Sequence, residues 1–107
     1  MTLDELLREL GSLPTMMTAK EELEVIERLE SVPDDLLLRD LERFFPLLWD
    51  LFDSHTGAGI FEGDASNREE FRAFAQRLRR LAVSVENPED AARLGNAADA
   101  FATDFRI

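Results

Sequence analysis

The stretch PDDLLLRDLERFFPLLWDLFD, residues 33–53, decides the fold. Its polar residues recur in steps of three or four, which is the spacing of one face of an α-helix, and the remainder is almost entirely apolar. The residues of this polar face are Asp35, Arg39, Glu42, Arg43, Pro46, Asp50 and Asp53. Pro46 falls on this polar side, where water can bond the carbonyl that a helical proline leaves without a donor. The stretch therefore predicts a single central helix over about 33–53, kinked at Pro46.

Four helix start signals surround this stretch. Three of them fit the capping box, in which a hydroxyl accepts from the third helical N–H and a glutamate reaches back to the first residue. These begin at Thr2, Thr18 and Ser66, and a fourth start is Asn87 followed by Pro88. Together with apolar residues at helical spacing, they predict helices over about 2–10, 18–31, 66–84 and 88–105. We expect an all-α fold, a compact bundle of four to five helices, in one domain over 1–107.

The composition is that of a folded protein with a highly charged surface. The chain has 107 residues, of which 45% are apolar and 33% are charged, and this size fits one domain. It has no cysteine, so it forms no disulfide and offers no thiolate to a metal or a substrate. The N-terminus carries acids where a secretory signal carries bases, and charges interrupt every apolar run. We therefore expect a cytoplasmic protein that does not span a membrane.

The negative charge is concentrated in the first part of the chain. The net charge is −11, and residues 1–65 hold 16 of the 23 acids and five of the 12 bases. Phosphate binding needs an excess of lysine and arginine, so direct nucleic-acid binding is not expected. An acidic surface instead favours association with a basic protein. Two other interpretations stay open, because many cytosolic proteins are acidic and a salt-adapted proteome also acidifies protein surfaces.

We expect the acidic part of the chain to contact the partner. The carboxylates predicted to face outward lie on the helix over 18–31, at the start of 33–53 and in the connector that follows. With an apolar pair in that connector, the predicted partner-binding residues are Glu21, Glu24, Glu27, Asp34, Asp35, Ile60, Phe61, Glu62 and Asp64. Ile60 and Phe61 would either fold back over the core or anchor the partner. Glu22 falls inside the apolar arc of its helix, either as a first-turn acid or as a buried ion pair or partner contact.

The connector LFDSHTGAGIFEGD, residues 51–64, partially resembles the calcium loop of EF-hand proteins. Asp53, Ile60 and Asp64 match the first, eighth and twelfth positions of that loop, and the resemblance implies a metal sensor at 53–64. The third position is His55 rather than an acid, the sixth lacks the glycine that makes the sharp turn, and aspartate at the twelfth is too short for the usual bidentate contact. Two carboxylates cannot supply six or seven oxygens, so we expect no metal and no cofactor.

Catalytic motifs are absent from the sequence. His55 is the only histidine, which excludes the zinc and di-iron motifs that need two. The glycines of the connector follow a helix rather than a strand and precede no lysine, so they do not form a phosphate-binding loop. We expect no catalytic residues and no enzyme activity.

These observations predict a non-enzymatic, acidic, helical protein-binding module. By analogy of size, charge and fold class, it would be an inhibitor or immunity protein that engages a basic surface of a toxin or of a nucleic-acid-binding protein, or a nucleic-acid mimic. The alternative is a small structural subunit or a homodimer, in which a second chain covers the apolar helix over 33–53.

Overall fold

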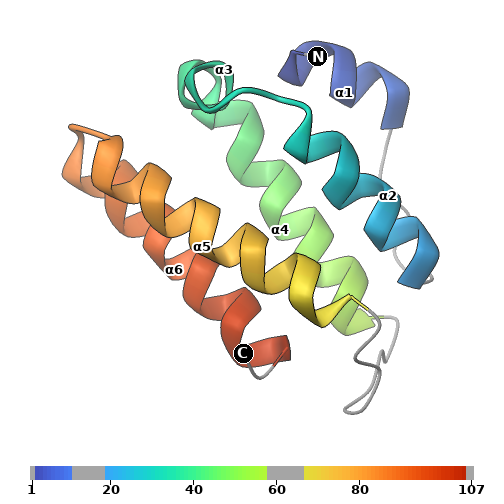
Figure 1. Ribbon diagram of the computed structural model, residues 1–107. Coiled ribbons are helices and arrows are strands. Elements are labelled where there is room, and N and C mark those ends of the chain that lie inside the picture. Colours follow the sequence, from blue (N-terminus) through green and yellow to red (C-terminus); the bar gives the residue numbers. More distant parts are fainter. Residues whose placement is uncertain (1, 11–18, 58–66, 106–107) are drawn as a thin grey trace. The chain divides into compact units, whose positions relative to one another are not determined.

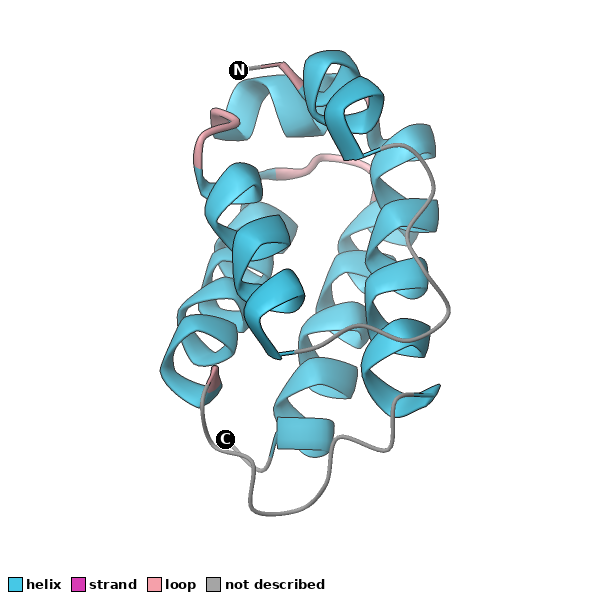
Figure 2. Cartoon of the chain, turned by 90° about the vertical axis from the view of Figure 1, so that its right-hand side faces the viewer, coloured by secondary structure: helices cyan, strands magenta, loops and turns pink. Residues whose placement is uncertain are grey.

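The computed structural model describes residues 2–10, 19–57 and 67–105 and is all-α (Figure 1). Figure 2 shows helices and loops, and no strand occurs within those three ranges. The helices are α1 (Leu3–Leu10), α2 (Ala19–Glu30), α3 (Asp34–Arg39), α4 (Leu41–Gly57), α5 (Arg68–Ser84) and α6 (Pro88–Phe105). The predicted fold class is therefore confirmed, with six helices in the described residues where four to five were expected.

The chain divides into two compact units. The first is Met1–Phe61, which contains α1 to α4, and the second is Glu62–Ile107, which contains α5 and α6. The expectation of a single domain over 1–107 stays a prediction.

The first unit begins with the predicted capping box. The amide of Glu5 donates to Oγ1 of Thr2 at 3.1 Å, and the amide of Thr2 donates to Oε2 of Glu5 at 3.3 Å. These reciprocal bonds satisfy amides that the first turn of a helix leaves without partners. Leu3 and Leu6 of α1 are buried, and α1 contacts α2. The cap thus fixes the start of a short helix whose apolar side enters the core.

The single kinked helix predicted over 33–53 is wrong in one respect, because α3 and α4 are separate helices that meet at Asp40. The amide of Asp40 bonds the carbonyl of Leu37 at 3.2 Å, and φ and ψ of Asp40 are −120° and 41°, outside the helical region. The carbonyl of Asp40 then accepts from the amides of Arg43 and Phe44, both at 2.9 Å, and so starts α4. Aspartate is a poor residue for a helix interior and a good one at a helix start, which accounts for the break.

Pro46 lies inside α4 and is exposed, as the polar stripe predicted. The helix continues past it to Gly57, four residues beyond the predicted end. The opposite side of α4 supplies the largest group of buried side chains in the first unit, namely Phe44, Phe45, Leu47, Leu48 and Leu51. One exposed proline therefore leaves the core-forming side of the helix intact.

The second unit is a helical hairpin in which α5 and α6 lie side by side (Figure 1). Phe101 of α6 stacks on Phe71 of α5, with ring centroids 5.6 Å apart, and meets Phe74 edge to face at 5.7 Å. Asn87 caps α6 as predicted, since its Oδ1 accepts from the amides of Glu89 and Asp90 at 2.9 and 3.3 Å. The N-cap of α5 is Asn67, one residue after the predicted Ser66, which lies outside the described residues.

Gly95 lies in the interior of α6, and a Cβ built on it meets no atom within 4 Å. Glycine in a helix interior costs about 1 kcal/mol relative to alanine, because it loses more backbone freedom on folding. We therefore expect Gly95→Ala to raise the free energy of unfolding by about 0.5–1 kcal/mol. Urea denaturation followed by circular dichroism measures the change, and a loss of stability would contradict the open space seen around this position.

Candidate functional site

The exposed side of α2 is a row of carboxylates. Glu21, Glu24, Glu27 and Glu30 follow one another at steps of three and are all exposed, while Val25, Ile26 and Leu29 on the other side are buried. Glu24 and Glu27 line a shallow, open hollow together with Arg28 and Ser31. We call Glu21, Glu24, Glu27 and Glu30 the α2 acidic row, and its first three members are the ones that the sequence predicted.

The acidic row is followed directly by two more carboxylates. Asp34 and Asp35 form the first turn of α3 and are both exposed, as predicted. Acids in the first turn are favoured by the positive end of the helix dipole. Glu24, Glu27 and Asp35 make no ion pair with any described residue. The charge of these three side chains is therefore not neutralised by a described base.

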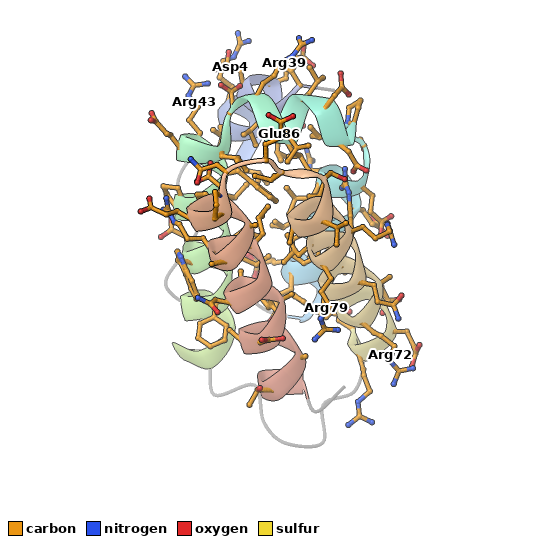
Figure 3. All side chains as sticks on the ribbon, turned by 90° about the vertical axis from the view of Figure 1, so that its left-hand side faces the viewer. Asp4, Arg39, Arg43, Arg72, Arg79 and Glu86 are labelled. Carbon is orange, nitrogen blue, oxygen red and sulfur yellow. The ribbon has the colours of Figure 1, made fainter. Side chains whose placement is uncertain are left out.

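Several bases of the first unit are instead engaged by α1, and Figure 3 labels the two members of one such pair, Arg43 and Asp4. Arg28, the only base on α2 after Lys20, pairs with Glu9. Nη1 of Arg43 on α4 lies 2.6 Å from Oδ1 of Asp4, and Nη2 of Arg8 lies 3.1 Å from its Oδ2. These pairs are partly exposed, so each contributes little to stability. Arg28 lies beside Glu24 and Glu27, but the ion pair that it makes is with Glu9.

The Arg43 guanidinium, through its hydrogen bond and its charge, lowers the pKa of Asp4 below the ordinary 3.8, and Arg8 adds to the effect. A carboxyl whose pKa is lowered by folding stabilises the fold above its unfolded pKa, and that contribution is lost as the pH falls through the folded value. We therefore expect the carboxyl resonance of Asp4 to titrate below pH 3.8 and to move back towards it in Arg43→Gln. An unchanged titration in the variant would show that the pair does not form in solution.

Glu22 is the one buried carboxylate among the described residues, with 1% of its surface exposed. No buried side-chain oxygen or nitrogen in the described part of the chain lacks a hydrogen-bond partner, so this carboxylate is satisfied. Glu22 lies in the first turn of α2 and is also buried, so it is a first-turn acid that makes a buried contact. It is therefore unavailable to a partner, unlike its neighbours on α2.

Four of the predicted partner-binding residues, Ile60, Phe61, Glu62 and Asp64, lie outside the described residues. The structure nevertheless weakens the resemblance to a calcium loop. The backbone is helical through Gly57, so residues 53–57 belong to α4. In an EF-hand these would be the first five positions of the loop. Within the described side chains, no group of three or more His, Cys, Asp or Glu could hold a metal ion.

Trp49 is exposed, although the sequence pattern assigned it only to the apolar bulk of the central helix. It is 39% exposed, and the other large exposed apolar residue of the described ranges is Val83 on α5. Trp49 lies three residues after Pro46 and seven after Glu42, so helical spacing places it with the polar side. That spacing was the signal that would have identified it.

None of the described helices is long and apolar enough to cross a membrane. No family model, curated protein or solved structure matches this chain.

Proposed function

We propose that this protein is a non-enzymatic binding module that engages a basic surface of a partner protein, in the manner of an inhibitor or immunity protein. The α2 acidic row is the observation that supports the proposal best. Glu24 and Glu27 are exposed, point away from the buried side of α2 and pair with no described base. Such a surface attracts a basic protein over roughly 10 Å, the screening length at about 0.1 M salt.

The surrounding structure keeps this charge oriented. Val25, Ile26 and Leu29 fix the opposite side of α2 in the core, and the Arg28–Glu9 pair ties α2 to α1. The carboxylates therefore project from a helix that is packed on its other side. A charged surface steers the encounter and fixes its register, while apolar contacts supply most of the lifetime of the complex.

The alternative function, a structural subunit or homodimer joined through residues 33–53, has weaker support. Most apolar side chains of α3 and α4 are buried within the chain, and Trp49 is the large apolar residue there that is exposed. One tryptophan is too small a patch for an obligate interface, which buries at least about 2,000 Å². Light scattering over a range of concentrations tests this alternative, since a homodimer would double the apparent mass.

We expect the association rate with a basic partner to depend on the acidic row. Glu24→Gln/Glu27→Gln should slow association about three- to tenfold at low salt and leave dissociation nearly unchanged, because steering acts on the encounter. Stopped-flow measurements over a range of ionic strength follow the effect. The matched control is Glu86→Gln/Glu89→Gln, which removes the same charge from exposed residues of the second unit. Equal slowing by both variants, or an association rate that does not change with ionic strength, would contradict the proposal.

A further inference from the structure

A second surface of the first unit combines an exposed tryptophan with exposed carboxylates. Four exposed residues of α4, Glu42, Pro46, Trp49 and Asp50, follow at steps of four, three and one, so they lie along one side of the helix. We call them the Trp49 face.

The indole of Trp49 contacts an aromatic ring one turn further along α4. Its ring centroid lies 6.0 Å from that of Phe52, and the two rings meet at 86°. This edge-to-face arrangement is one that aromatic pairs prefer. With 39% of the residue exposed, part of the ring remains accessible to another molecule. Tryptophan offers cations the most favourable aromatic face.

Negative charge flanks the indole without a described counter-ion. Glu42 and Asp50 are exposed and form no ion pair with any described residue. Arg43 is the base of α4 on this flank, and it is engaged by Asp4 on α1. A cation that arrives at the Trp49 face therefore meets two carboxylates and no nearby free base of α4.

Pro46 adds a backbone acceptor to the same face. In an α-helix the carbonyl of residue 42 would accept from the amide of residue 46, and proline has no N–H to donate. Glu42 and Pro46 are both exposed. The carbonyl of Glu42, which receives no amide from residue 46, therefore belongs to an exposed part of α4 and can accept from a donor outside the helix.

From these three features we infer that the Trp49 face binds an arginine side chain of the partner protein. A guanidinium is planar and stacks on an aromatic ring, and its five N–H groups can reach carboxylate and carbonyl oxygens at once. Lysine presents a compact, strongly hydrated charge that meets these demands less well. This inference rests on the proposed function and names the group that the basic partner would insert.

The test uses three short peptides that are identical except at one set of positions, which carry arginine, lysine or citrulline. Trp49 is the only tryptophan, so its emission reports from the site itself. We expect the arginine peptide to change that emission, the lysine peptide to bind about threefold more weakly, and the citrulline peptide about tenfold more weakly. Equal affinity for all three would overturn the inference.

Variants locate the site independently of emission. By anisotropy of a labelled arginine peptide, we expect Trp49→Leu and Glu42→Gln/Asp50→Gln each to lower affinity about three- to tenfold, and Trp49→Phe to retain part of it. Glu86→Gln/Glu89→Gln controls for the change in net charge. One outcome would separate the two proposals. If Trp49→Leu and Glu42→Gln/Asp50→Gln both bind the peptide as tightly as this control, the arginine site is wrong. If Glu24→Gln/Glu27→Gln still weakens binding in that case, the proposed function stands. If the arginine peptide does not bind at all, both fail.

Discussion

Phe101→Ala is expected to lower the free energy of unfolding by about 3–5 kcal/mol. Phe101 is fully buried and is the centre of the aromatic cluster in the second unit. Its ring contacts both Phe71 and Phe74 of α5. Truncation to alanine removes the ring from the core, leaves a cavity between two helices, and deprives two other phenylalanines of their partner.

The measurement is urea denaturation followed by the circular dichroism signal of the helices. Phe101→Leu should cost less, because the smaller side chain still fills part of the site. Val83→Ala is the matched control, since Val83 is 88% exposed and its truncation should change stability by less than about 0.5 kcal/mol. If Phe101→Ala cost no more than this control, the aromatic cluster would not hold the hairpin together.

The same variant tests whether the chain is one cooperative domain. Trp49 belongs to the first unit and Phe101 to the second, while circular dichroism reports on all the helices. In a single domain, tryptophan emission and circular dichroism should give one coincident transition, and Phe101→Ala should shift both. If Phe101→Ala left the midpoint of the Trp49 emission transition unchanged, the two units would unfold separately.

The parts of the fold that sequence predicts best are those with local causes. Two examples are the bonds between Thr2 and Glu5 and the bonds that the first amides of α6 donate to Oδ1 of Asn87, all of which join residues at most three apart. The break at Asp40 was missed because the polar stripe continues in phase from α3 into α4. Hydrophobic periodicity shows which side of a helix is buried, but it is insensitive to a change of backbone geometry at one residue that keeps the phase.

The candidate site was predictable in its charges and not in its pairings. Exposure of Glu24, Glu27 and Asp35 follows from helical spacing alone. The pairing of Arg28 with Glu9 depends on how α1 packs against α2, and that of Arg43 with Asp4 joins residues 39 positions apart. Burial of Glu22 likewise depends on what surrounds its helix. Contacts of this kind are set by tertiary structure, which a single sequence does not reveal.

Pro46→Ala is expected to have the second largest effect on stability and the opposite sign. Alanine supplies the N–H that can donate to the carbonyl of Glu42, and it removes the clash between the proline ring and the preceding turn. Together these changes favour the helix by about 3 kcal/mol. Loss of the restriction that proline places on the unfolded chain offsets about 1 kcal/mol of this gain. Because Pro46 is exposed, little packing is lost. We expect a net stabilisation of about 1–2 kcal/mol in urea denaturation.

This variant also separates stability from binding at the Trp49 face. Once the substituted alanine donates its amide to the carbonyl of Glu42, that oxygen has less capacity for a guanidinium, so affinity for the arginine peptide should fall severalfold while the fold becomes more stable. Gly95→Ala is the matched control, because it should stabilise α6 without touching α4. Unchanged affinity in Pro46→Ala would show that the carbonyl takes no part in binding. A loss of stability would mean that α4 depends on the conformation that proline imposes, and the acceptor at Glu42 would then be a consequence of the fold rather than part of a site.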